Sequence, residues 1–271
     1  MRRLLIRPGA IGDCILSFPA LEHLARADYN EIWISRPVAP LVHFAQEVLP
    51  LSATGIDLFA VGDLAPQPQL VSKLRSFDHI VSWYGTNRPE FREAMHALPV
   101  RCDFHPALPP PDYKHHATRF FAEQSGADPN IAPHIRVPAS PRRETVVIQP
   151  FSGSAKKNWP LESFGELARL LPLEVEWCAG PEEALPGAFQ FDELSDLASW
   201  MSGARLYIGN DSGITHLAAA IGLPAVALFG PSSPDVWAPR GAQVIVLQQQ
   251  PWSNLRVETV LEAASRLLRS R

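Results

Sequence analysis

The hydrophobic positions of the chain fall into short apolar runs separated by segments with helical spacing. Short apolar runs are typical of buried strands, and apolar positions that recur every third or fourth residue are typical of amphipathic helices. In the first half these patterns predict, in order, a strand at 4–7, a helix at 15–25, a strand at 31–35, helices at 40–48 and 69–77, a strand at 79–83, and helices at 90–98 and 114–125. Such alternation predicts a parallel sheet with crossover helices.

The same alternation starts again in the second half. It predicts strands at 145–149, 174–179, 205–208, 225–229 and 243–247, helices at 161–171, 193–201 and 214–221, and a last helix at 257–268 that packs against one of the sheets. Residues 129–141 contain four prolines and little periodicity, which is typical of a linker. We therefore predict two Rossmann-like, doubly wound α/β domains, 1–138 and 139–271, which bind ligands in a cleft between them.

Composition and charge exclude several classes of protein. With 46% hydrophobic and 19% charged residues, the 271-residue chain is too apolar for a disordered protein and too polar for a membrane bundle. A net charge of -4 lacks the basic excess of nucleic-acid-binding proteins, so we expect no nucleic-acid partner. The longest apolar run, 217–229, contains a glycine and a proline and predicts no membrane span, while docking on a membrane surface stays open. The first apolar stretch is interrupted by Pro8 and Asp13, which predicts no export leader.

The cysteines and histidines do not form a metal-binding pattern. Cys14, Cys102 and Cys178 are far apart in the sequence and indicate neither a metal knuckle nor a disulfide framework. The histidines at 105, 115 and 116 lack ligand spacing beside further cysteines or paired carboxylates. We therefore predict no metal and no cofactor.

A turn with two glycines follows the first predicted strand. Gly9 and Gly12 allow the backbone to turn sharply and to approach a ligand, although their spacing differs from the dinucleotide-binding GxGxxG motif. Asp13 has two interpretations. It caps the following helix, or it is a carboxylate at the carboxyl end of a strand that takes a proton from a substrate hydroxyl group.

A second turn gathers polar and basic side chains after the first strand of the second half. The chain contains four lysines, and two of them, Lys156 and Lys157, lie here beside Ser152, Gly153 and Ser154. Hydroxyl groups, backbone N–H groups and a lysine ammonium group are donors that suit a diphosphate. We interpret the turn as an anion cradle, with an ordinary polar turn as the alternative.

A third turn precedes an Ala-rich helix. The N-terminus of this helix offers free N–H groups and the positive end of the helix dipole, and Gly213 allows a phosphate to approach closely. Asp211 and Ser212 are good helix N-caps, and Asp211 also suits a ribose or sugar hydroxyl group. His216 either faces the cleft or packs in the core. The turn is a second candidate phosphate site.

Basic side chains of the first half offer a weaker signal. Arg88 and Arg92, with Lys114 and Arg119, suit an anionic substrate on the N-terminal side of the cleft. Solvated helix faces are the simpler interpretation of these four residues.

Together the motifs resemble the ADP-heptose:lipopolysaccharide heptosyltransferase family, glycosyltransferases of the GT-B type. Residues 149–160 are similar to the family's HPGSG...KxWP motif, with Gln149 and Phe151 in place of a histidine and a glycine. Residues 209–220 are similar to GNDSGxxHLAAA, residues 229–240 to FGPTxP...WxP, and residues 7–21 to RxGxxGDxxxxxPAL. The similarity is strongest in the second half.

This resemblance implies a GT-B fold, in which two Rossmann-like domains face a central cleft, with the acceptor on the N-terminal domain and the nucleotide sugar on the C-terminal one. It implies inverting, metal-independent transfer of heptose from ADP-heptose to a hydroxyl group of a lipopolysaccharide inner core or a related envelope glycan. The acceptor is then a saccharide or lipid-linked saccharide. Such an acceptor implies that the enzyme is cytoplasmic and contacts the inner face of the cytoplasmic membrane peripherally.

The resemblance also implies roles for individual residues. Asp13 becomes the general base, and Lys157 is the second catalytic residue because it stabilises the departing ADP. The donor-binding residues are Ser152, Gly153, Ser154, Lys156, Asp211, Ser212, Gly213, His216 and Glu182, and the acceptor-binding residues are Gly9, Gly12 and Arg88.

Two alternatives stay open beside this enzyme. One is a non-catalytic nucleotide-sugar-binding relative, which has no reason to retain both Asp13 and Lys157. The other is a GT-B-like sugar-nucleotide epimerase, which needs a further acid–base pair that the sequence does not display.

Overall fold

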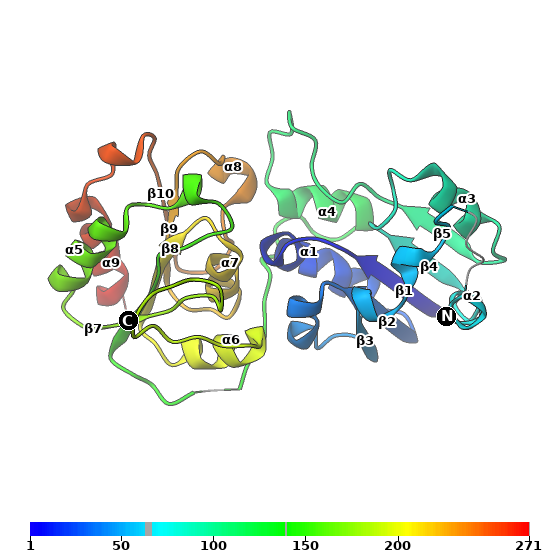
Figure 1. The fold of residues 1–271 in the computed structure, drawn as a ribbon, viewed down its shortest axis with the longest axis horizontal. Helices are drawn as coiled ribbons and strands as arrows, with labels where there is room; N and C mark the ends of the chain where they lie inside the picture. The colour runs from blue at the N-terminus through cyan, green and yellow to red at the C-terminus, as the bar shows by residue number, and fades with distance from the viewer. Residues whose placement is uncertain (63–66, 139, 271) are drawn as a thin grey trace. The chain divides into compact units, whose positions relative to one another are not determined.

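The structure, a computed structural model, describes residues 1–62, 67–138 and 140–270. The chain divides into two compact α/β units, Met1–Tyr113 with Ala117–Ile131 and Lys114–His116 with Ala132–Arg271 (Figure 1). Ala139, at which the predicted second domain begins, lies outside the described residues. Each unit is built around one parallel five-stranded sheet.

The first unit contains a sheet with the strand order β3-β2-β1-β4-β5. Its elements are β1 (Arg2–Arg7), α1 (Ile11–Leu24), β2 (Tyr29–Ile34), β3 (Glu47–Pro50), α2 (Pro68–Arg75), β4 (His79–Ser82), α3 (Pro89–His96), β5 (Arg101–Phe104) and α4 (Ala117–Ser125), with 3-10 helices at Arg36–Leu41, Leu51–Ala53 and Ile56–Leu58. The order reverses between β1 and β4, as in Rossmann sheets, so the carboxyl ends of these two strands mark the expected ligand edge.

Helices cover both faces of the first sheet. Leu4 and Ile6 of the central strand β1 are fully buried and pack in one cluster with side chains of α2 and α3. Leu5, also fully buried, points to the opposite face because side chains alternate along a strand, and on that side α1 packs against α4. A strand covered on both faces needs a continuous apolar run, which is why β1 was predictable from its sequence.

One helix predicted in the first half is wrong. Residues 40–48 do not form an α-helix: a 3-10 helix ends at Leu41, and Glu47–Pro50 forms the edge strand β3, which pairs with β2 in parallel. Pro37 and Pro40 lack the N–H groups that an α-helix needs, so they limit this segment to a short 3-10 turn. The strand β5 was not predicted because half of its four positions are charged.

The second unit contains a sheet with the strand order β10-β9-β8-β6-β7. Its elements are β6 (Thr145–Gln149), α5 (Leu161–Leu170), β7 (Glu174–Trp177), α6 (Leu194–Ser202), β8 (Leu206–Asn210), α7 (Gly213–Ala220), β9 (Ala225–Phe229), α8 (Pro234–Trp237), β10 (Val244–Gln248) and α9 (Val257–Arg269), with 3-10 helices at Ala155–Lys157 and Trp252–Asn254. Apart from the short helix α8 and the two 3-10 helices, these match the predicted elements. The strand order reverses between β6 and β8.

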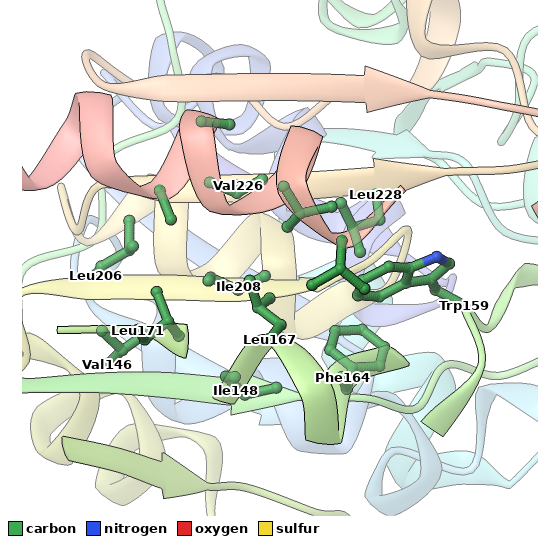
Figure 2. Close-up of a cluster of buried hydrophobic side chains, with 14 of the residues drawn as sticks. Val146, Ile148, Trp159, Phe164, Leu167, Leu171, Leu206, Ile208, Val226 and Leu228 are labelled. Atoms are coloured by element: carbon green, nitrogen blue, oxygen red, sulfur yellow. The ribbon is translucent and has the colours of Figure 1, made fainter. Parts of the chain in front are cut away.

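The core of the second unit lies between one face of its sheet and the pair of helices α5 and α9, which pack against each other. Figure 2 shows Ile148 and Ile208 of the strands lying beside Phe164 and Leu167 of α5. Burying one such side chain stabilises the fold by roughly 1.5–3 kcal/mol. The last helix therefore closes this sheet, as its spacing predicts, while α6 and α7 pack together on the other face.

The longest helices of the described chain are α1 and α9, with 14 and 13 residues. Across the described ranges, no helix is both long and apolar enough to span a membrane.

Candidate functional site

The two polar turns of the second unit lie at the carboxyl edge of its sheet, where the strand order reverses. The cradle loop (residues 151–160) follows β6, and the α7 turn (residues 210–213) follows β8. These two strands pair directly, from Val146↔Leu206 to Gln149↔Gly209. In open α/β sheets, ligands bind at such a reversal, outside the carboxyl ends of the strands. The fold thus brings together two turns that the sequence separates by about fifty residues.

Asn210 connects the two turns. Its Oδ1 atom accepts a hydrogen bond from the backbone N–H of Trp159 at 3.0 Å, and its Nδ2 donates to the carbonyl of Pro150 at 2.7 Å. The side chain is fully buried, so both bonds are shielded from water and each would leave a costly unpaired group if lost. Sequence analysis missed this residue, although an asparagine at the end of a buried strand is itself a signal for such a bond.

An ion pair joins the cradle loop to the α7 turn. Lys157 Nζ lies 2.7 Å from Asp211 Oδ2, and Ser232 Oγ donates to the same oxygen at 2.5 Å. The Asp211 side chain is only 6% exposed, whereas that of Lys157 is 37% exposed. A buried carboxylate needs such partners to offset the loss of hydration. The lysine keeps access to solvent and hence to a ligand.

Ser212, and not Asp211, caps helix α7. The backbone N–H of Thr215 donates to Ser212 Oγ at 3.3 Å, so the prediction that Asp211 caps the helix is wrong and that for Ser212 is confirmed. Gln149, which stands where the related motif has a histidine, accepts hydrogen bonds from Ser212 Oγ and Tyr207 Oη, both at 3.2 Å. This amide therefore anchors the helix N-terminus to the end of β6.

His216 lies buried on α7, close enough to the ion pair to interact with it. Burial lowers its pKa to about 4; Asp211 opposes this shift, and His116 and Lys157 add to it. The ring is therefore neutral at pH 7. Its Nδ1 atom has no hydrogen-bond partner among the described residues. A buried ring nitrogen without a partner, beside a charged pair, suits contact with a ligand better than it suits packing alone.

His116 belongs to the second unit, although sequence analysis gave it no role in the site. Its Nε2 lies 2.8 Å from the carbonyl of Ala238, and burial lowers its pKa to about 4. The electrostatic interaction between His116 and His216 places it near the α7 turn. No sequence signal links these two histidines, because one hundred residues separate them.

The remaining predicted donor residues differ in their surroundings. Ser152 Oγ lies 2.6 Å from Asn158 Oδ1, so this hydroxyl group stabilises the cradle loop itself. Gly153 and Lys156 are exposed. Glu182 is exposed in the segment after β7, and its contact with a ribose stays a prediction. The other two predicted members lie on the turns already described, Ser154 just before the 3-10 helix of the cradle loop and Gly213 as the first residue of α7.

In the first unit, Asp13 lies in the first turn of α1 and is half-buried. The N-cap residue of this helix is Ala10, so Asp13 is not its N-cap residue. A carboxylate in the first helical turn is stabilised by the helix dipole. Gly9 has a φ of 136°, which favours glycine, and Gly12 lies inside the same helical turn.

Arg88 precedes α3 and contacts the backbone after β3. Its guanidinium group donates to Tyr84 Oη at 3.3 Å and to the carbonyl of Phe59 at 3.4 Å, and it lies over the ring of Phe91. Arg119, by contrast, pairs with Glu123 one turn away on an exposed helix face. The solvated interpretation thus fits Arg119, and a role for Arg88 in acceptor binding stays a prediction.

The described residues contain no group of three or more histidine, cysteine, aspartate or glutamate side chains arranged to hold a metal ion. The positive charge at the edge of the second sheet comes from Lys157 and from the N-terminus of α7. Groups of this kind suit an anionic ligand.

The fold defines the class of this protein: a two-unit α/β protein in which each unit is built on one parallel five-stranded sheet, with polar turns after β6 and β8 in the second unit. The model of glycosyltransferase family 9 (heptosyltransferase) matches residues 102–263, which are more than half of the chain. The chain belongs to this family. The membership that the motifs predict is confirmed.

Curated relatives match parts of the chain. Lipopolysaccharide heptosyltransferase 2 of Escherichia coli K12 is 36% identical over 97 residues, which are 35% of this chain and 25% of the relative. Lipopolysaccharide heptosyltransferase 1 of the same strain is 30% identical over 128 residues, 41% of this chain and 40% of the relative. The matches thus span less than half the length of either relative.

Solved structures match the fold over nearly the whole chain. The glycosyl transferase family 9 structure from Veillonella parvula has a TM-score of 0.78 at 20% identity, with coverage of 100% of this chain and 97% of that one. The E. coli ADP-heptose lps heptosyltransferase II has a TM-score of 0.75 at 17% identity, with coverage of 100% and 99%. At these identities the likeness concerns the fold, and it confirms the predicted GT-B class.

Proposed function

We propose that this chain is an inverting, metal-independent glycosyltransferase that moves heptose from ADP-heptose to a hydroxyl group of a lipopolysaccharide inner core or a related envelope glycan. The observation that carries the proposal is the Lys157–Asp211 pair at the N-terminus of α7, where a cation, helix N–H groups and a buried carboxylate meet. Family membership and the names of the relatives, which are heptosyltransferases, support the choice of sugar.

The second unit binds the donor in this proposal. Lys157 Nζ and the N–H groups at the start of α7 bind the diphosphate, on which negative charge grows as it leaves. Lys157 then contacts both the phosphate and Asp211. The carboxylate of Asp211 accepts hydrogen bonds from sugar hydroxyl groups. The free Nδ1 of His216 supplies a further polar contact. The neutral state of this histidine suits a hydrogen bond better than an ionic contact.

The first unit binds the acceptor and supplies the base. Asp13 takes the proton of the acceptor hydroxyl group as its oxygen attacks the anomeric carbon. The bond from that carbon to the diphosphate oxygen breaks, and ADP leaves with the bonding electron pair. Attack from the side opposite the leaving group inverts the anomeric centre. Arg88, at the carboxyl edge of the same sheet, binds the acceptor.

Calorimetry with ADP, UDP, GDP and ADP-heptose tests the donor site. We expect selective ADP binding that the heptose tightens. Lys157→Ala should weaken ADP binding by about tenfold or more, because a charged hydrogen bond contributes about 1.5–3 kcal/mol. Lys156→Ala is the matched comparison, since it removes an exposed neighbouring charge, and it should weaken binding less. A preference for UDP or GDP would replace the proposed donor, and equal effects of the two variants would remove Lys157 from its specific role.

Transfer to an acceptor separates the enzyme from a non-catalytic relative. Incubation with ADP-heptose and a heptose-deficient lipopolysaccharide core should yield ADP and the extended saccharide in equal amounts. Donor binding without any product would favour the non-catalytic relative.

A further inference from the structure

Arg7, the last residue of β1, is a fully buried arginine at the edge that carries Asp13. Its guanidinium group makes three hydrogen bonds in three directions. Nε donates to Ser17 Oγ at 3.0 Å, one terminal nitrogen donates to the carbonyl of Pro8 at 2.5 Å, and the other donates to the carbonyl of Asp13 at 3.0 Å. The carbonyl of Pro8 lies at the start of the turn between β1 and α1, and that of Asp13 lies in the first turn of α1.

Burying this cation is expensive, so its position requires an explanation. A buried charge costs several kcal/mol unless hydrogen bonds and nearby charge offset the loss of hydration. Burial lowers the pKa of Arg7, and Cys14 and Asp13 oppose that shift. The guanidinium group also lies over the ring of Phe121, 4.7 Å from its centroid. Only the planar fork of arginine supplies donors in all three directions at once.

The turn itself leaves little freedom once Arg7 is in place. Ser35 Oγ donates to the carbonyl of Gly9 at 2.5 Å, and the N–H of Cys14 donates to the carbonyl of Ala10 at 3.0 Å. Gly9 has a positive φ, and a Cβ atom there would lie 3.4 Å from both Arg7 and the Asp13 side chain. The guanidinium group and the base of the Asp13 side chain thus both lie beside Gly9.

We propose that Arg7 is a positioning residue: its buried guanidinium group fixes the Pro8–Asp13 turn and thereby the carboxylate of Asp13. This inference rests on the proposed function, in which Asp13 is the general base. Arg7 does not touch the substrate. It acts through the backbone carbonyls that it holds and through its charge beside the carboxylate.

Transfer kinetics separate positioning from a merely structural role. We expect Arg7→Met to lower kcat by about 10- to 100-fold, since a displacement of about 1 Å from the productive geometry costs a factor of that order. The KM for the donor should change by less than about twofold, because the donor site lies in the other unit. Arg7→Lys, which keeps the charge but not the three-way fork, should recover part of kcat.

Arg3→Met is the matched control. Arg3 lies near the start of the same strand and donates to the carbonyl of Leu24, at the far end of α1. Its loss removes a similar link between β1 and α1 without touching the turn. We expect Arg3→Met to lower thermal stability and to leave kcat unchanged. An equal loss of kcat in both variants would overturn the proposal, because it would trace the effect to general loosening of β1 and α1.

A measurement without substrate tests the proposal even if the chain transfers no sugar. Amide hydrogen exchange should be faster at residues 9–13 in Arg7→Met than in the wild type, and unchanged at residues 206–216. If Arg7→Met does not fold, Arg7→Lys and Ser17→Ala, which removes one partner of the fork, are compared in the same way. A folded variant with unchanged exchange in this turn overturns the inference. No transfer by the wild type, with the expected exchange, would count against the proposed function alone.

Discussion

The two units place functional turns at equivalent edges of their sheets but hold them by different means. In the second unit, side chains from several segments cross-link the turns: Asn210 joins them, Lys157 pairs with Asp211, and Gln149 binds Ser212. In the first unit, the buried Arg7 holds both ends of the turn that carries Asp13. The turns of the second unit are thus joined by several side-chain contacts between segments, whereas in the first unit one buried cation binds two carbonyls of the turn. The match to the family model, residues 102–263, lies mostly in the second unit.

The largest expected effect comes from the first unit. Asp13→Asn should lower kcat by about 10²- to 10⁴-fold, because the amide cannot accept the proton of the acceptor hydroxyl group. ADP affinity, which we propose depends on the second unit, should stay the same. Release of ADP in a coupled assay, together with calorimetry, measures both quantities. Asp57→Asn, at an exposed carboxylate of the same unit, is the control. Unchanged turnover in Asp13→Asn would remove this residue as the base.

The cross-linked turns of the second unit should depend strongly on Asn210. Asn210→Ala should reduce the free energy of unfolding by about 2–4 kcal/mol, because it leaves the N–H of Trp159 and the carbonyl of Pro150 without partners. Chemical denaturation followed by tryptophan fluorescence measures the change, with the exposed Asn254→Ala as the matched control. A loss below about 0.5 kcal/mol would show that the two turns hold their positions without this link.

Acid should weaken the second unit through its buried histidines. Burial lowers the pKa of His216 to about 4, below the ordinary value of about 6.5, so the unfolded chain binds more protons between these pH values. Stability from the neutral ring is complete above pH 6.5 and falls as the pH drops toward 4, by about 2 kcal/mol at pH 5. His216→Asn should reduce the difference in unfolding free energy between pH 7.5 and pH 5, whereas the exposed His134→Asn should not. Equal pH dependence in both variants would contradict the assignment.

The smallest effect concerns the helix cap. Ser212→Ala should reduce the free energy of unfolding by about 1 kcal/mol, the usual contribution of a serine N-cap, while Ser212→Thr should retain most of it. Thermal unfolding of the two variants beside the exposed Ser253→Ala measures this difference. A loss of unfolding free energy well above 1 kcal/mol would mean that the contacts of Ser212, Gln149 and Tyr207 act cooperatively. The turns of the second unit would then be cross-linked more strongly than a single cap explains.

Hydrophobic spacing predicted most of the strands and helices because buried strands and amphipathic helices must carry apolar residues in fixed patterns. The pattern failed at 40–48 and at β5, where prolines or charged residues occupy edge positions that need little burial. The three polar turns were also predictable, since glycine, serine, aspartate and lysine concentrate in short segments after predicted strands. Their chemistry follows from residue type, and the family follows from the combination of motifs.

The sequence by itself thus determined the fold class, the family and the residue types of the two turns in the proposed donor site. Tertiary structure alone decided which side chains meet. It paired Lys157 with Asp211, gave Asn210 its two partners and brought His116 near His216. It also buried the guanidinium group of Arg7, which donates to the carbonyl of Asp13. Sheet order and helix packing set the distances between these residues. A local sequence pattern therefore cannot predict these contacts.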